Sequence, residues 1–110
     1  MPVEILSEAM RRIAPADRDV EELGSGYGGM QGPAEGPVWI REGGFLLFSD
    51  IHNSRRMRWT PGQGVTLDKE RTNNANGMTR DREGRLVVCH HFSRCVDREE
   101  PDGSVTVVAR

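Results

Sequence analysis

Two side chains in this sequence carry oxygen atoms that could bind a metal ion. Glu35 lies in the acidic loop Ala34-Glu35-Gly36-Pro37-Val38-Trp39, and Asn76 lies in Ala75-Asn76-Gly77. A carboxylate and an amide oxygen suit hard cations, which points to calcium, magnesium, manganese or, less selectively, zinc. Two oxygen ligands do not complete a metal site, so the hypothesis depends on whether the fold brings them together.

Each of these residues also has a purely structural interpretation. Glu35 could be a surface glutamate on a glycine-rich turn, although we favour a ligand there. Asn76 could be a left-handed turn residue, because Asn-Gly is a common turn pair. For Asn76 both interpretations stay open.

Other polar residues are assigned mainly structural roles. His90 or His91 could face a site as a ligand or proton carrier, because imidazole titrates near neutrality. Neighbours on a strand point to opposite faces, which favours one packed and one exposed histidine. Asp50 is expected to be a turn-capping or inter-strand acceptor rather than a base. Cys89 and Cys95 are expected to be reduced.

Composition limits the class of protein. The chain has 110 residues, 35% hydrophobic and 29% charged, which allows one core at most. A net charge of −2, with interspersed signs, predicts no nucleic-acid partner and no membrane anchor. No apolar run is long enough to span a membrane, and the opening residues do not resemble a secretory signal, so the predicted location is cytoplasmic.

Local patterns predict one short helix followed by strands. The helix is expected over residues 7 to 13, with Ser7 as N-cap and a stop at Ala14-Pro15. Residues 24 to 37 are rich in glycine and predict an irregular loop. Six β-type runs follow, at 38–40, 45–48, 57–59, 65–67, 86–89 and 105–108, separated by hairpin-like turns.

An internal repeat organises these runs. Sliding the chain by 40 residues brings six identities between residues 41–70 and 81–110 into register, among them Gly44 with Gly84, Leu46 with Leu86 and Arg58 with Arg98. A period near 40 with four short strands is typical of a β-propeller blade. The prediction is an all-β fold with about two blades of an incomplete propeller, divided into an N-terminal extension (1–19) and a partial propeller (20–110).

The same repeat relates the two candidate ligands. It sets Glu35-Gly36-Pro37 against Ala75-Asn76-Gly77, at the start of the first strand of each unit. The first strand of a propeller blade lines the central channel, so Glu35 and Asn76 are expected to be neighbours there.

Six short motifs follow one another in a fixed order in the two units. The first unit contains Glu35-Gly36-Pro37-Val38-Trp39, Leu47-Phe48-Ser49-Asp50-Ile51 and Arg58-Trp59-Thr60-Pro61-Gly62. The second unit contains Asn74-Ala75-Asn76-Gly77-Met78, Gly84-Arg85-Leu86-Val87-Val88-Cys89 and Glu100-Pro101-Asp102-Gly103-Ser104. In this order they resemble the senescence-marker-protein/gluconolactonase family of regucalcin-like, six-bladed propellers. The resemblance covers roughly residues 20 to 110. Cys89-His90-His91 departs from it, because many members read Cys-Glu-His.

The resemblance implies metal-dependent hydrolysis of a sugar lactone. It makes Glu35 a metal ligand and Asn76 a substrate contact, and it implies a general base beyond residue 110. Two blades cannot close a ring, so the chain is expected to be an N-terminal portion that is inactive alone, or to self-associate through exposed blade edges. The alternative is a non-catalytic propeller remnant that acts as a binding or assembly module.

Overall fold

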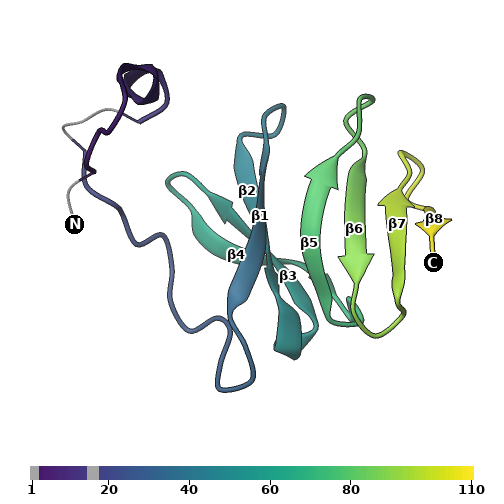
Figure 1. The fold of residues 1–110 in the computed structure, drawn as a ribbon. Helices are drawn as coiled ribbons and strands as arrows, with labels where there is room; N and C mark the ends of the chain where they lie inside the picture. Colours follow the sequence, from purple (N-terminus) through teal and green to yellow (C-terminus); the bar gives the residue numbers. More distant parts are fainter. Residues whose placement is uncertain (1–2, 15–17) are drawn as a thin grey trace.

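Two antiparallel sheets make up the fold of the computed structural model, which describes residues 3–14 and 18–110. Each sheet has four strands in sequential order, β1-β2-β3-β4 and β5-β6-β7-β8 (Figure 1). The strands are β1 (Ala34–Ile40), β2 (Phe45–Asp50), β3 (Arg55–Thr60), β4 (Gly64–Glu70), β5 (Ala75–Arg80), β6 (Leu86–His90), β7 (Cys95–Glu99) and β8 (Val105–Ala109). The predicted all-β pair of propeller blades is therefore confirmed, and we call the two sheets blade 1 and blade 2.

The predicted short helix near the N-terminus is a 3-10 helix, η1 (Glu8–Arg12). Ser7 is the N-cap residue, as predicted, and has the extended backbone of that position, but its side chain makes no cap hydrogen bond. None of the five helical residues is buried, so no packing supports a longer α-helix. The predicted stop at Pro15 lies outside the described residues. No helix in the described part of the chain is long and apolar enough to cross a membrane.

Two strands escaped the sequence prediction, and a third begins earlier than expected. β5 and β7 were not predicted, because ANGMTR and CVDRE lack an apolar alternation. β1 begins at Ala34, inside the segment expected to be an irregular loop. Both missed strands pair with β6. Hydrogen bonding to this neighbour, rather than the intrinsic strand propensity of their residues, determines their extended conformation.

The observed strand pairing changes the alignment of the two repeat units by one residue in their first strands, β1 and β5. In β2 and β6 the 40-residue shift holds, since Phe48 pairs with Met57 as Val88 pairs with Asp97. In the inner strands, Ala34 pairs with Asp50, whereas Ala75 pairs with His90. Ala34 therefore corresponds to Ala75, a shift of 41. Consequently Glu35 corresponds to Asn76, not to Ala75.

The core lies between the two blades. Leu47 of blade 1 is buried against Ala75, Leu86 and Val88 of blade 2. Figure 1 shows β1 beside β5, so the inner strands of the two blades run next to each other. This contact fixes the relative positions of the inner strands and hence of Glu35 and Asn76.

Candidate functional site

A cleft of about 220 Å³ lies where the starts of β1 and β5 meet. Its lining mixes polar and apolar groups and comes from both blades and from the glycine-rich segment before β1. The lining residues are Gln31, Gly32, Pro33, Glu35, Ile51, His52, Asn76 and His91. The two residues predicted from the sequence to be neighbours thus line one cleft.

Glu35 is exposed at this cleft and opposes Ser49 on β2. Its carboxylate has no hydrogen bond or ion pair with any residue in the described ranges. The ladder shifts register immediately after it, between Glu35 and Val38, so the strand bends where the cleft opens. An exposed carboxylate with free oxygens can accept a cation without giving up a protein partner.

The backbone of Asn76 is held by blade 1. The Ser49 hydroxyl donates a hydrogen bond of 2.6 Å to the Asn76 carbonyl oxygen. Gly36 has φ +65°, and a Cβ there would lie 2.5 Å from the same oxygen. Only glycine fits this close approach between the inner strands. The side-chain amide of Asn76 remains available to the cleft.

The alternative of a left-handed turn at Asn76 is wrong. Asn73 and Asn74, with φ of +52° and +51°, make the turn before β5 instead. Asn76 itself lies within β5, at the register shift between Ala75 and Met78. The Asn-Gly pair therefore marks a bulged inner strand and not a hairpin.

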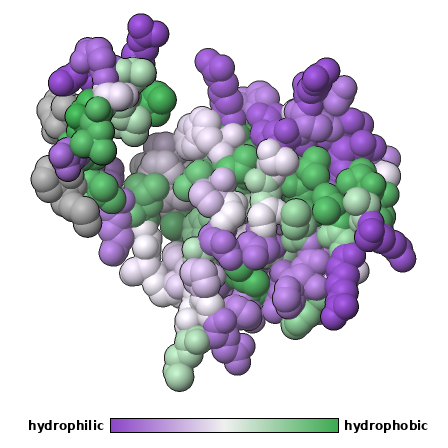
Figure 2. Space-filling view, in the orientation of Figure 1, coloured by the Kyte–Doolittle hydropathy of each residue, from purple (hydrophilic) through white to green (hydrophobic). Residues whose placement is uncertain are grey.

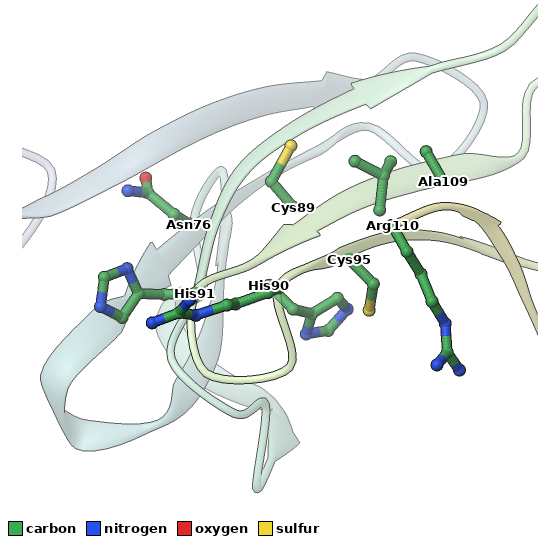
Figure 3. Close-up of a pocket in the computed structure, with 9 residues that line it drawn as sticks. Asn76, Cys89, His90, His91, Cys95, Ala109 and Arg110 are labelled. Atoms are coloured by element: carbon green, nitrogen blue, oxygen red, sulfur yellow. The ribbon is translucent and has the colours of Figure 1, made fainter.

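The two adjacent histidines point to different surroundings, as predicted. His90 is packed: its side chain is 13% exposed, Nδ1 lies 3.0 Å from the Thr72 carbonyl oxygen, and Nε2 lies 2.6 Å from Oδ2 of Asp97. The Nε2 contact is close but is not aligned as a hydrogen bond. His91 is exposed and lines the cleft. Figure 3 shows the two rings diverging from the end of β6.

His52 belongs to the cleft but was not identified from the sequence. It lies in η2 (Ile51–Asn53), directly after β2. Its ring covers Gly32, where a Cβ would lie 2.5 Å from Nε2. His52 is outside any strand, so a two-residue periodicity gives no indication of where its side chain points.

Asp50 is a structural acceptor, as predicted. It is fully buried and accepts hydrogen bonds of 2.9 Å from the Gly28 amide and from Asn53, as well as bonds from Arg55. Burial raises the pKa of the Asp50 carboxyl, but the hydrogen bonds from Arg55, Gly28 and Asn53 outweigh burial and lower it. Asp50 thereby ties the glycine-rich segment, which walls the cleft, to the sheet.

The cysteines are both free, and they lie beside a second, larger hollow of about 450 Å³ on β6 and β7 (Figure 3). Cys89 is opposite Val96, whereas Cys95 is opposite His90. Because side chains alternate along a strand, the two thiols project from opposite faces of blade 2. They do not form a disulfide.

The donors in the cleft fit only part of a metal site. Within residues 3–14 and 18–110, no group of three or more histidine, cysteine, aspartate or glutamate side chains could hold a metal ion. Glu35 and Asn76 provide a carboxylate and an amide, both of which suit a hard cation. They therefore supply a fraction of a coordination sphere.

A family model described as the SMP-30/gluconolactonase/LRE-like region matches residues 33–110, from just before β1 to the end of the chain. The chain belongs to the SMP-30/gluconolactonase/LRE-like family. The match includes both blades and four of the polar residues at the cleft, Glu35, His52, Asn76 and His91.

Relatives named gluconolactonase support this membership. The gluconolactonase of Zymomonas mobilis is 31% identical over 81 residues, which cover 62% of this chain and 23% of that protein. A solved structure assigned as a gluconolactonase superimposes with a TM-score of 0.75 at 26% identity, covering 86% of this chain and 32% of that one. The structure of a gluconolactonase from Xanthomonas campestris superimposes with a TM-score of 0.63 at 30% identity, covering 69% of this chain and 26% of that one. The chain thus spans about a quarter to a third of the length of these family members.

Proposed function

We propose that this chain provides part of the metal and substrate site of a sugar-lactone hydrolase. The observation that carries the proposal is the equivalence of Glu35 and Asn76, which occupy matching positions on adjacent inner strands and line one cleft. Membership of a family whose relatives are named gluconolactonase supports a sugar lactone as the substrate class.

In this proposal Glu35 is a ligand of a divalent metal and Asn76 contacts the substrate. The metal is calcium, magnesium, manganese or zinc, and when bound it would polarise the lactone carbonyl. Glu35 would hold the cation through its free carboxylate. Asn76 would direct its amide to the ring oxygens or hydroxyls, because its backbone is already fixed by Ser49. The general base is not among the residues assigned to this cleft.

The second candidate function is a non-catalytic binding or assembly module. It is favoured by the incomplete donor set and by the apolar side chains left on the outer sheet faces, including Trp39, Leu67 and Val108. Under either function the cytoplasm stays the predicted compartment, and nucleic acid and membranes stay predicted non-partners.

Metal binding by the purified chain distinguishes the two functions, because the chain supplies a metal ligand without the general base that hydrolysis needs. In calorimetric titrations we expect binding of manganese, calcium, magnesium or zinc, and we expect Glu35→Gln to abolish it. Glu42→Gln is the matched control, because Glu42 follows the other end of β1, where it pairs with Arg80. If no metal binds, or if the Glu35 variant binds as well as the unchanged chain, Glu35 is not a metal ligand and the module function is preferred.

A further inference from the structure

In β5 Asn76 is followed directly by Gly77, and the two residues can react with each other. The backbone nitrogen after an asparagine can close a five-membered ring on the side-chain carbon Cγ. A glycine at that place has no Cβ to hinder the approach. Of the four asparagines in the chain, only Asn76 precedes a glycine. The surroundings of the pair determine whether the ring can close.

At the other three asparagines the nitrogen that would attack already donates a hydrogen bond. The amides that follow Asn53, Asn73 and Asn74 donate to Ile51, Ser54 and Thr72 at 2.9, 3.1 and 3.0 Å, respectively. An amide that is held in this way cannot turn toward the preceding side chain without losing its bond. These three asparagines are therefore internal standards for the reactivity of Asn76.

The Asn76-Gly77 pair lies where the ladder of blade 2 is irregular. The pairing of β5 with β6 shifts between Ala75 and Met78, so Asn76 and Gly77 have no Cα partner on β6. A Cβ built on Gly77 would meet nothing within 4 Å, so the space beside its backbone is open. The Asn76 side-chain amide makes no hydrogen bond to a residue of the described ranges. Both reacting groups thus have room to approach each other.

Ser49 activates the nitrogen of this pair. Its hydroxyl donates the hydrogen bond of 2.6 Å to the Asn76 carbonyl oxygen, which belongs to the same peptide group as the Gly77 nitrogen. When that nitrogen loses its proton, resonance moves negative charge onto the oxygen. A fixed donor stabilises such a charge as an oxyanion hole does, and Ser49 is only 1% exposed, so little water competes for the bond.

We propose that Asn76-Gly77 is a self-modification site, at which the Asn76 amide becomes a carboxylate and so adds a metal ligand to the cleft. The Gly77 nitrogen gives up its proton and bonds to Cγ of Asn76. The bond from Cγ to Nδ2 then breaks, and Nδ2 leaves as ammonia. One water opens the resulting succinimide, at the Cγ side to give aspartate or at the backbone carbonyl side to give isoaspartate. Water is consumed and ammonia is released, with no change of oxidation state.

The reaction needs water, and the surroundings of the pair admit it. Asn76 and Gly77 are both half-buried rather than enclosed. In Figure 2 the hydrophobic surface gathers toward the β7–β8 end, whereas the lower end of the blades, where β1 and β5 begin in Figure 1, is mainly hydrophilic. Solvent can therefore reach the succinimide in the folded chain.

The gain of a ligand rests on the proposed function. Position 76 matches Glu35 on the neighbouring inner strand, and both residues line the same cleft. The affinity of an oxygen site for a hard cation rises with the number of its carboxylates. The modification would therefore strengthen the metal site, at the cost of the amide that contacts the substrate.

The test follows the chain without metal or substrate, so that its failure is separate from failure of the proposed function. The purified chain is kept in warm, mildly alkaline buffer and mapped by mass spectrometry after digestion with trypsin. Residues 72–80 form one tryptic peptide that contains three of the four asparagines, so fragmentation compares them in the same molecule. We expect the mass gain of an amide converted to an acid at Asn76, ahead of Asn73 and Asn74.

Two variants separate the role of the fold from the role of the sequence. Ser49→Ala keeps the Asn-Gly pair but should slow the reaction about tenfold, the effect of one hydrogen bond to a charged group. Gly77→Ala, which the open space accommodates, should slow Asn76 to the rate of Asn74, which also precedes an alanine. Ser104→Ala is the matched control, because it removes a hydroxyl from an exposed turn and should leave the rate unchanged.

Circular dichroism checks that each variant is folded, and Ser49→Cys, whose thiol is a weak donor, replaces Ser49→Ala if that variant is not. An Asn76 that reacts no faster than Asn73 and Asn74 would overturn the proposal. So would an equal rate in the Ser49 variant and the unchanged chain. In calorimetric titrations with manganese, Asn76→Asp should bind more tightly than the unchanged chain, and equal affinities would overturn the gain of a ligand. Loss of binding in Glu35→Gln tests the proposed function separately.

Discussion

Asp50 and Glu35 are carboxylates on neighbouring strands of blade 1, and their surroundings give them opposite roles. Asp50 is fully buried, with donors from Gly28, Asn53 and Arg55 around it. Glu35 is exposed, and its oxygens are free within the described part of the chain. A buried carboxylate that is saturated with donors stabilises the fold, whereas a free one is available to a ligand.

Replacing Asp50 should therefore destabilise the protein strongly. Asp50→Ala leaves the Gly28 amide and the Asn53 amide without their acceptor, and it frees Arg55, so we expect a loss of about 3 kcal/mol in the free energy of unfolding. Urea denaturation measures the loss. Asp102→Ala is the matched control, because Asp102 lies on an exposed turn, where its loss should change the free energy of unfolding far less. Equal losses for the two variants would show that Asp50 has no special structural role.

At the residue scale, side-chain type and the repeat were enough to predict that Glu35 and Asn76 lie close together, and both line one cleft. The role of Asp50 followed from its place at the end of a strand, and the divergence of His90 and His91 followed from strand alternation. His52 could not be predicted, because it reaches the cleft from a 3-10 turn whose direction depends on the contact with Gly32. The one-residue correction that aligns Glu35 with Asn76 also required the observed pairing.

At the scale of the elements, an ion network fastens β3 and β4 of blade 1 to β7 of blade 2. Arg56 and Lys69 both reach Glu99, whose side chain is 25% exposed. Burial raises the pKa of the Glu99 carboxyl, but hydrogen bonds from Arg56 and Lys69 outweigh burial and lower it. The network is thus an electrostatic link across the blade contact, beside the apolar core around Leu47.

This lowered pKa predicts that the blade contact weakens in acid. A carboxyl whose pKa is lower in the folded state contributes stability above its unfolded pKa, here the ordinary value of 4.5, and loses it as the pH falls through the folded pKa. Stability should therefore be level above about pH 5.5 and fall below about pH 4.5. Thermal unfolding across this range measures the trend.

Glu99→Gln should flatten the acid slope and lower stability at neutral pH by about 2 kcal/mol, because it removes charge-assisted hydrogen bonds from Arg56. Glu83→Gln is a suitable control, since Glu83 is largely exposed on the β5–β6 turn. If the loss of stability in acid is unchanged in the Glu99 variant, other groups such as Asp50 cause that loss.

The strands also show which parts of the fold a local sequence pattern does not predict. Short runs of β-type residues located β2, β6, β8 and parts of β1, β3 and β4, and turn residues located the hairpins between them. β5 and β7 were missed because their residues are mostly polar and are held extended by the ladder and by ion pairs such as that of Glu99. Pairing between strands is a property of the folded chain, which a local pattern does not contain.

On the scale of the whole molecule, the chain is two consecutive blades that share one interface. That interface positions the starts of β1 and β5 and so creates the cleft. The family match covers both blades, and the relatives are three to four times as long as the matched part, with 23%, 32% and 26% of their lengths covered. The cleft is therefore the part of the family's channel that this chain contributes, as we propose.

The most direct test of this account is where a paramagnetic cation binds. In amide proton–nitrogen spectra of the chain titrated with manganese, we predict that resonances of residues around Glu35 and Asn76 broaden first, that Glu35→Gln abolishes this broadening, and that Glu42→Gln does not. Broadening that is centred elsewhere, or that is unchanged in the Glu35 variant, would contradict the assignment of Glu35 as a metal ligand.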